Sequence, residues 1–285
     1  MTTSRDIMIT DVGPRDGLQN ESCIVSLEDK VRLVEELAEA GLPEVEVSAF
    51  VRPDRVPQLA DAAEVFAAIS RRAGTLYSGL VPNERGLQRA IEAGVDKISL
   101  FTAASETFTA RNTNATIDKT IERFRPVVEQ ASKVNVSVRA YISCVVACPY
   151  EGPIAAEAVR DLAERLLELG PMEIDLGDTI GVATPADIEH LLEIVSPVES
   201  VDRLVLHLHD TQGEAIACAA RAIDCGIRRF DSACGGLGGC PFAPGAPGNL
   251  STMSLLELCH DRGLSTGVDI DAVRQTGQWI RRVLG

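Results

Sequence analysis

The sequence predicts an α/β protein, a closed (β/α)8 barrel of the TIM type with a C-terminal helical appendage. Short β-type runs alternate with amphipathic helical stretches from one end of the chain to the other. Eight such strand–helix units recur at intervals of about 25 to 35 residues. The length of 285 residues is normal for one barrel of this kind.

The expected elements follow from local pattern and from helix stop signals. In the first helix, Val31, Val34 and Leu37 share one face, and Gly41 stops the helix as a C-cap residue. The expected strands are residues 7–11, 45–49, 76–81, 97–102, 136–144, 173–177, 203–208 and 229–233. The expected helices are residues 27–40, 56–69, 85–93, 117–132, 154–169, 185–195, 214–225 and 250–261, with 264–284 as the appendage.

Alternating units of this kind require parallel strands joined by crossover helices. Eight units favour closure into a barrel over the alternative, a doubly wound open sheet, whose usual Gly-x-Gly-x-x-Gly turn after the first strand is absent. No linker rich in serine, proline or charge interrupts the chain, so we expect one catalytic domain over residues 1–285.

Composition excludes several classes of protein. A hydrophobic fraction of 45% and a charged fraction of 24% are those of a globular protein. A net charge of −15 should repel nucleic acid and anionic membranes, so neither is an expected partner. The N-terminus has no secretory signal and no apolar run is long enough to span a membrane. Eight cysteines are too few for a disulfide scaffold, which favours reduced thiols and a cytosolic location.

The strongest chemical signal is the pair His207 and His209 at the end of the seventh expected strand. Residues i and i+2 of a strand point to the same side, so both imidazoles should face one point. A single histidine on an apolar strand is more often a core residue, but two at this spacing indicate a metal site. In a barrel, this end of the strands is where active sites lie.

Other polar residues are expected at the same rim. The turn after the first strand contains Pro14 and two glycines and should present Arg15 and Asp16 to the barrel mouth, although loop charges can also be simple surface residues. A carboxylate beside two imidazoles is an N/O ligand set that suits Mg²⁺ or Mn²⁺. Glu46 and Asp178 could support the metal or move protons, or pair with arginine. Tyr141 could reach into the barrel or serve packing.

A glycine-rich loop follows the eighth expected strand. Its six glycines between Gly235 and Gly248 allow close approach to a ligand. Cys240 within this loop could deliver a proton when the loop closes, and its alternative role is that of a small buried hydrophobe.

Five segments in order along the chain resemble hydroxymethylglutaryl-CoA lyases, and the resemblance covers nearly the whole sequence. They are residues 11–21 (DVGPRDGLQNE), 144–152 (CVVACPYEG), 176–181 (LGDTIG), 207–211 (HLHDT) and 236–242 (GLGGCPF). The glycine-rich GLGGCP segment is the most specific of them.

The resemblance implies a barrel lyase that cleaves 3-hydroxy-3-methylglutaryl-CoA to acetyl-CoA and acetoacetate, a step of leucine degradation. It implies a homodimer and a divalent ion held by Asp16, His207, His209 and Asn249. Arg15 resembles the arginine that polarises the thioester carbonyl, and Cys240 the thiol that protonates the acetyl-CoA carbanion. The resemblance assigns supporting roles to Asp178, Glu46 and Tyr141, and contacts with substrate to Arg15, Asn112 and Gln19.

Some positions depart from the family pattern, namely Ala49, Gln212, Glu214 and Met253. They leave open a different branched substrate, such as citramalyl-CoA or an isoprenoid-derived 3-hydroxyacyl-CoA. A condensing acyltransferase resembling isopropylmalate synthase is a second alternative, since those enzymes also place His-x-His and a metal on a barrel. A barrel that binds metal without turning over substrate is a third.

Overall fold

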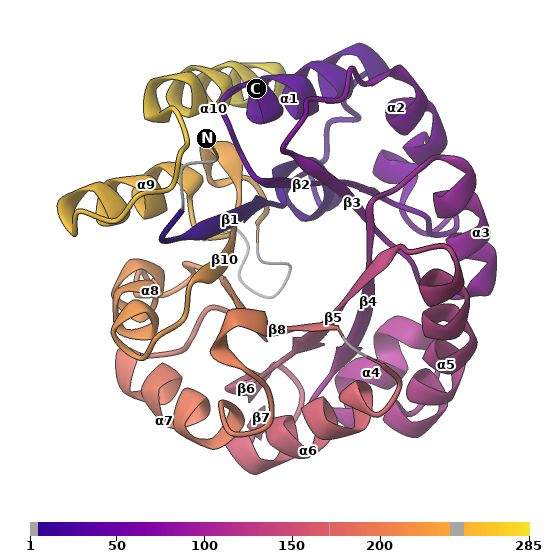
Figure 1. The fold of residues 1–285 in the computed structure, drawn as a ribbon, viewed down its shortest axis with the longest axis vertical. Helices are drawn as coiled ribbons and strands as arrows, with labels where there is room; N and C mark the ends of the chain where they lie inside the picture. The colour runs from indigo at the N-terminus through magenta and orange to yellow at the C-terminus, as the bar shows by residue number, and fades with distance from the viewer. Residues whose placement is uncertain (1–4, 171, 240–247) are drawn as a thin grey trace.

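A computed structural model describes residues 5–170, 172–239 and 248–285, and it confirms the predicted (β/α)8 barrel. Eight parallel strands close in the order β1-β10-β9-β8-β5-β4-β3-β2, as the view along the barrel in Figure 1 shows. The strands are β1 (Met8–Asp11), β2 (Glu44–Ala49), β3 (Leu76–Leu80), β4 (Lys97–Ala103), β5 (Ser137–Ser143), β8 (Glu173–Asp178), β9 (Leu204–Leu208) and β10 (Arg229–Ser232).

The helices form a ring outside the strands (Figure 1). They are α1 (Leu27–Glu39), α2 (Ala62–Ala68), α3 (Glu84–Glu92), α4 (Glu106–Thr113), α5 (Ile117–Lys133), α6 (Ala156–Leu167), α7 (Pro185–Val195), α8 (Ala215–Asp224), α9 (Thr252–Asp261) and α10 (Ile270–Leu284). Within the described ranges, none of them combines the length and the apolar character that crossing a membrane requires. The seven cysteines in those ranges are all free thiols.

The C-terminal appendage is the helix α10, which packs against α1 (Figure 1). It begins at Ile270, later than the expected residue 264, because the side chain of Asp269 accepts hydrogen bonds from the backbone N–H groups of Asp271 and Ala272 and caps it there. The guanidinium of Arg32 on α1 lies 4.1 Å from the ring centroid of Trp279 on α10. This cation–π contact joins the appendage to the first helix of the ring.

The helix expected over residues 56–69 was wrong in its first part. A 3-10 turn at Pro57–Leu59 precedes the shorter helix α2. The ammonium of Lys30 donates to the backbone carbonyl of Gln58 at 2.5 Å and to Asp61 at 2.7 Å. The carbonyl of Gln58 therefore accepts a side-chain hydrogen bond in place of a backbone hydrogen bond within a helix.

The helix α4 and the two-stranded hairpin β6 (Ala147–Cys148) and β7 (Gly152–Pro153) were not predicted.

The barrel interior is filled by charged side chains, where many such barrels carry branched aliphatic layers. Arg139 on β5 is 1% exposed and lies at the centre. Its guanidinium donates to Glu173 and Asp231 at 2.9 Å each and to Glu44 at 3.2 Å. Lys97 on β4 pairs with Glu44 at 2.7 Å and Glu173 at 2.8 Å. This network, which we call the ionic core, ties together strands from opposite sides of the barrel.

The ionic core sets the charge states of its members. Burial acts to raise the pKa of Glu173, but Arg139 and Lys97 outweigh it and hold that pKa at about 2. Asp175 on β8 is fully buried, and burial together with neighbouring Asp231 raises its pKa well above the ordinary value. The ionic core therefore keeps Glu173 ionised, whereas Asp175 beside it favours its protonated form.

Candidate active site

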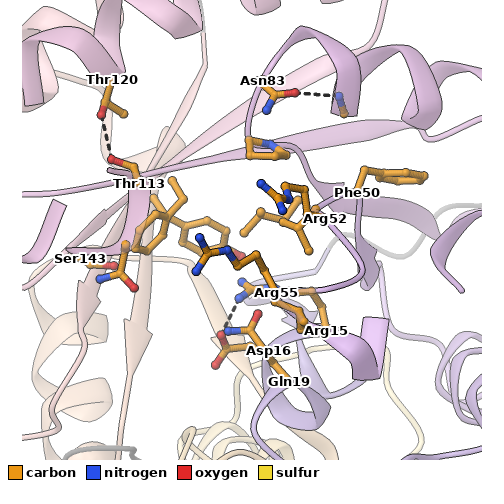
Figure 2. A pocket seen from close by; sticks show the side chains of 18 of the residues that line it. Arg15, Asp16, Gln19, Phe50, Arg52, Arg55, Asn83, Thr113, Thr120 and Ser143 are labelled. Atoms are coloured by element: carbon orange, nitrogen blue, oxygen red, sulfur yellow. Dashed lines mark hydrogen bonds and ion pairs between the residues drawn. The ribbon is translucent and has the colours of Figure 1, made fainter. Parts of the chain in front are cut away.

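A cavity opens at the C-terminal ends of the barrel strands. Its volume is about 1120 Å³. Figure 2 shows Arg15, Arg52 and Arg55 gathered within it, with Asp16 and Gln19 beside them. Tyr141, His207 and His209 also line it, so the cavity includes most residues that the sequence placed at the barrel mouth.

A single π-helical turn at Gly13–Gly17 positions Arg15 and Asp16 where the sequence predicted a tight turn. The carboxylate of Asp11 accepts hydrogen bonds from the backbone N–H groups of Gly13 at 2.9 Å and Cys234 at 3.2 Å, which fixes the start of this turn. Arg15 is only 6% exposed. Its Nε donates to Glu46 and its Nη1 to Asp16, each at 2.5 Å. The guanidinium is thus held rigidly against two carboxylates.

Three candidate metal ligands converge at the cavity floor. Ligand atoms of Asp16, His207 and His209 all lie within 4.8 Å of one another. The Nε2 atoms of the two imidazoles are 3.2 Å apart, and Nε2 of His209 lies 3.9 Å from an oxygen of Asp16. The side-chain oxygen of Asn249 is buried and has no hydrogen-bond partner among the described residues, while its Nδ2 donates to Asp16 at 2.9 Å. Three converging N/O donors, with an unpartnered amide oxygen on a residue that contacts one of them, fit a divalent ion.

The two histidines differ electrostatically. Burial and the neighbouring His207 lower the pKa of His209 to about 4, so this imidazole is neutral at pH 7 with a lone pair available. Burial also acts to lower the pKa of His207, but the hydrogen bond to Asp231 and the charge of Asp16 outweigh it and raise that pKa. Burial opposes ionisation of Asp16 as well, yet Arg15 and the imidazoles hold its pKa far below the usual range. An ionised carboxylate beside nitrogen donors is the combination that attracts a cation.

The glycine-rich segment approaches the metal ligands closely. Gly238 has a φ of +94°, and a Cβ at this position would lie 2.6 Å from Nδ2 of Asn249. Only glycine is compatible with both that backbone conformation and that contact. Cys240, which follows two residues later, lies outside the described residues.

A second layer of residues lies beneath the cavity floor. The hydroxyl of Tyr141 donates to Asp231 at 3.0 Å and to Glu46 at 3.2 Å. Asp231 on β10 is paired in register with His207 on β9, and its carboxylate lies 3.2 Å from Nδ1 of that imidazole. Asp231 also accepts from Arg139, so it links the candidate metal site to the ionic core.

The sequence interpretation did not single out Asp231. The only signal in the sequence was an acidic residue between Phe230 and Ser232 in a short expected strand. An acidic residue is unusual in a buried strand, but this signal does not indicate which side chain it would bind. The partner became visible only when β9 and β10 were placed side by side.

The remaining site residues predicted from the sequence differ in whether they line the cavity. Asn112 on α4 and Gln19 line the cavity. Asp178 ends β8 and is 2% exposed, and its carboxylate accepts from the backbone N–H groups of Val182 at 3.3 Å and Ala183 at 2.9 Å. Burial raises the pKa of Asp178. Glu46 and Asp178 are not among the described cavity-lining residues, so both lie behind the first wall of the cavity.

Comparison with known proteins agrees with this geometry. A family model described as HMGL-like matches residues 6–280. The chain belongs to the HMGL-like family. A 3-hydroxy-3-isohexenylglutaryl-CoA/hydroxymethylglutaryl-CoA lyase from Pseudomonas aeruginosa is 45% identical over 285 residues, which cover 100% of this chain and 95% of that protein.

Two solved structures of the HMGL-like family superpose closely on the barrel. The HMG-CoA lyase of Brucella melitensis has a TM-score of 0.96 at 42% identity, covering 98% of this chain and 99% of its own. An HMG-CoA lyase from Acinetobacter baumannii in complex with coenzyme A and 3-methylmalate has a TM-score of 0.94 at 37% identity, covering 100% of this chain and 93% of its own. The family resemblance read from the sequence motifs is confirmed.

The positions that depart from the HMGL-like pattern, Ala49, Gln212, Glu214 and Met253, are not among the described residues that line the cavity. Ala49 adjoins the wall, because it precedes Phe50 and pairs in register with Leu80, and both of these line the cavity. Gln212 and Glu214 are exposed on the surface, and Met253 on α9 packs partly buried against the hydrophobic core. Ala49 is therefore the departure that lies next to the described cavity wall, whereas Gln212, Glu214 and Met253 are not part of that wall.

The structure makes Asp231 testable as a residue that orients His207. We expect Asp231→Asn to weaken the affinity for a divalent ion by about 10–100-fold, because the carboxylate that fixes the ring and its tautomer is lost. Titration calorimetry with Mn²⁺ on chelator-treated protein measures this. Asp202→Asn, at an exposed site before β9, is the control. Equal Mn²⁺ affinity in Asp231→Asn and in the unaltered protein would contradict the role.

Proposed function

We propose that this protein is a metal-dependent carbon–carbon lyase that cleaves 3-hydroxy-3-methylglutaryl-CoA to acetyl-CoA and acetoacetate. The observation that carries the proposal is the placement of Arg15 directly beside three converging N/O donors, Asp16, His207 and His209, which line the same cavity. The names of the relatives in the HMGL-like family, which include hydroxymethylglutaryl-CoA lyases, support the substrate.

The proposed cofactor is Mg²⁺ or Mn²⁺, held by Asp16, His207, His209 and Asn249. A divalent ion bound there supplies Lewis-acid polarisation of oxygen and lowers the pKa of a bound hydroxyl. The pure N/O donor set, without a thiolate, is the reason for preferring these ions.

Asp178 is our candidate for the base that takes the proton from the C3 hydroxyl, through one intervening water because its carboxylate lies behind the cavity wall. It lies on the strand next to His207, forms no ion pair with any described cation, and has a raised pKa because it is buried. A carboxylate with a raised pKa is a stronger base than an ordinary aspartate. Loss of that proton turns C3 into the ketone of acetoacetate as the C2–C3 bond breaks.

The electron pair of the broken bond passes to C2 and the thioester oxygen, which makes an enolate. Arg15 remains cationic, because the adjacent carboxylates of Glu46 and Asp16 raise its pKa despite its burial. A fixed cation at the developing oxygen stabilises that charge without reorganisation. Cys240 then gives its thiol proton to C2 and forms acetyl-CoA, and the thiolate regains a proton from solvent.

A longer-branched 3-hydroxyacyl-CoA is the second candidate substrate. Four phenylalanines line the cavity, namely Phe50, Phe101, Phe108 and Phe124. An apolar wall of this kind favours an aliphatic branch, since burying each methylene contributes about 0.8 kcal/mol. The Pseudomonas aeruginosa relative is named for both an isohexenyl and a methyl substrate.

The deciding experiment measures acetyl-CoA release from 3-hydroxy-3-methylglutaryl-CoA with Mg²⁺ and with a chelator. We expect rapid release that depends on metal. Parallel reactions with the isohexenyl analogue and with citramalyl-CoA rank the substrates. Faster turnover of either would retain the lyase chemistry and change the assigned acyl group.

Two results would overturn the function. Free CoA release from acetyl-CoA and a 2-keto acid, without cleavage of hydroxyacyl-CoA, would make the protein a condensing acyltransferase. Metal binding with no turnover of any branched hydroxyacyl-CoA would make it a non-catalytic barrel.

We further propose that residues 1–285 act as one catalytic domain, that the enzyme is a homodimer and that it works in the cytosol. The homodimer and the location rest on the family resemblance and on the sequence. Light scattering measures the oligomeric state.

A further inference from the structure

The C-terminal helix α10 contacts the glycine-rich segment through one arginine. Arg281, near the C-terminal end of α10, donates from Nε to the backbone carbonyl of Gly235 at 2.5 Å and from Nη2 to the carbonyl of Gly236 at 3.0 Å. Both carbonyls belong to the turn Cys234–Gly236, which follows β10. One planar guanidinium therefore fixes two successive peptide groups that lie 46 and 45 positions away in the sequence.

The turn Cys234–Gly236 needs contacts from outside, because two of its three residues are glycine. Gly235 has a φ of +67° and Gly236 a φ of +61°, both in the left-handed region. Glycine adopts this region freely, but it also adopts many other conformations, so two successive glycines do not determine one backbone by themselves. The two hydrogen bonds from Arg281 stabilise the conformation that the turn has in this structure.

The helix α10 also packs closely against the same turn. A Cβ at Gly277 would lie 3.0 Å from the backbone nitrogen of Gly235, so a larger residue there would press on the turn. The thiol of Cys234 donates to the backbone carbonyl of Val273 at 3.6 Å. Val273, Gly277 and Arg281 are spaced four residues apart, so one face of α10 makes all of these contacts.

The residue after the turn contacts a proposed metal ligand. The backbone carbonyl of Leu237 accepts a hydrogen bond from Nδ2 of Asn249 at 3.2 Å, and Asp16 accepts from the same nitrogen at 2.9 Å. Asn249 is 3% exposed, and its Oδ1 has no hydrogen-bond partner among the described residues. Because the nitrogen and the oxygen belong to one planar amide, holding Nδ2 in place also fixes the direction of Oδ1.

We propose that Arg281 is a positioning residue for the divalent ion. Its hydrogen bonds fix the carbonyls of Gly235 and Gly236. The next carbonyl, that of Leu237, is thereby held where it orients the amide of Asn249. This rests on the proposed function, because Asn249 is a ligand only in the proposed metal site. Arg281 is exposed and is not among the described residues that line the cavity, so it acts on the ion through this chain of contacts.

Titration calorimetry with Mn²⁺ on chelator-treated protein tests the proposal, with Arg282→Gln as the matched control. Arg282 is the next residue of α10, is exposed, and forms no hydrogen bond or ion pair with the described residues. We expect Arg281→Gln to bind Mn²⁺ about 3- to 10-fold more weakly than Arg282→Gln does. This loss is smaller than the about 10–100-fold loss expected for a residue in direct contact with a metal ligand, because Arg281 acts through the turn.

The sign of the change separates positioning from simple electrostatics. Both variants remove one positive charge, and this removal by itself would strengthen the binding of a cation. Weaker binding in Arg281→Gln alone therefore reports the lost hydrogen bonds. Arg281→Lys keeps the charge but lacks the planar fork that reaches both carbonyls, so its Mn²⁺ affinity should lie between those of Arg281→Gln and the unaltered protein.

A double-mutant cycle shows whether the effect passes through Asn249. In an Asn249→Ala background, Arg281→Gln should change the Mn²⁺ affinity by less than about twofold, because the amide that the turn orients is absent. The three other proposed ligands remain in that background, so Mn²⁺ binding stays measurable. An undiminished effect of Arg281→Gln in that background would overturn the proposal, and so would equal Mn²⁺ affinities of Arg281→Gln and Arg282→Gln.

Hydrogen exchange gives a second readout that needs no metal. Mass spectrometry of the metal-free protein measures the exchange of the backbone amides of residues 235–239. We expect faster exchange in Arg281→Gln than in Arg282→Gln, because the turn loses the two hydrogen bonds that stabilise it. Equal exchange in the two variants would show that Arg281 does not hold the turn and would overturn the proposal.

The binding measurement does not depend on turnover. If the unaltered protein binds Mn²⁺ and cleaves no hydroxyacyl-CoA, while Arg281→Gln binds Mn²⁺ more weakly than Arg282→Gln, the proposed function fails and the positioning role stands. If cleavage is rapid and metal-dependent, and the two variants bind Mn²⁺ equally, the function stands and the positioning role fails. An unaltered protein that binds no Mn²⁺ would overturn both the metal site and the positioning role.

Discussion

Arg15→Gln is expected to lower kcat for cleavage of 3-hydroxy-3-methylglutaryl-CoA by at least about 10²–10³-fold, by analogy with the loss of one donor to a developing oxyanion. The guanidinium is held by Glu46 and Asp16 at 2.5 Å each, so its remaining donors face the cavity at a fixed angle. Glutamine keeps a hydrogen-bond donor but loses the charge. Steady-state measurement of kcat and KM with saturating Mg²⁺ gives the result.

Two further measurements show that the loss comes from Arg15 itself. Arg15→Lys retains the charge without the planar fork and should remain well below the unaltered enzyme. Arg203→Gln, at the opposite end of the barrel, should keep full kcat. Because Arg15 also neutralises Asp16, calorimetry with Mn²⁺ separates a change in metal affinity from a change in the chemical step. A kcat for Arg15→Gln within about threefold of the unaltered enzyme would remove Arg15 from the mechanism.

Arg139→Met is expected to lower the free energy of unfolding by about 3–5 kcal/mol, because removing one partner leaves buried charges uncompensated. Arg139 is 1% exposed and is the shared donor of Glu44, Glu173 and Asp231. Methionine fills much of the same volume, so the change tests the charges more than the packing. Urea unfolding at pH 7, followed by circular dichroism, measures it.

A surface arginine provides the comparison. Arg160→Met removes an exposed side chain on α6 that pairs with neighbouring Asp161 at 2.6 Å, and its effect should lie within about 0.5 kcal/mol. If Arg139→Met were as mild as Arg160→Met, the carboxylates of the ionic core would have to be protonated in the variant. Repeating both unfolding curves at pH 5 would detect that protonation, since the difference between the variants would then depend on pH.

The barrel could be predicted from the sequence because each strand–helix unit carries its own local signal. Apolar runs alternate with amphipathic stretches, and glycines such as Gly41 stop the helices. The short helix α4 could not be predicted, because five of its eight residues are threonine, arginine or asparagine and no apolar period is present. The hairpin of β6 and β7 could not be predicted either, because each of its strands has only two residues. The helix predicted across Pro57 failed because Lys30, far away in sequence, binds the carbonyl of Gln58.

The candidate site likewise contains residues that could be predicted from the sequence and residues that could not. His207 and His209 could be paired from the sequence because their spacing alone places both on one side of a strand. Asp231 and the arginines of the cavity wall could not be found in this way. Asp231 becomes a partner of His207 only through the register of β9 and β10, and Arg55 and Arg123 are 68 positions apart along the chain yet line one cavity.

The ionic core also has a consequence for how the chain can be divided. Arg139 belongs to β5, and its partners lie on β2, β8 and β10, so its hydrogen bonds join the two halves of the barrel. A fragment ending after α5 would keep the pair of Lys97 and Glu44 and lack Arg139, Glu173 and Asp231. Such a half-barrel would expose that ion pair and the apolar side chains around it, which the other half buries. The two halves are therefore expected to acquire stable structure together, in one cooperative event, and to be soluble partners only when mixed.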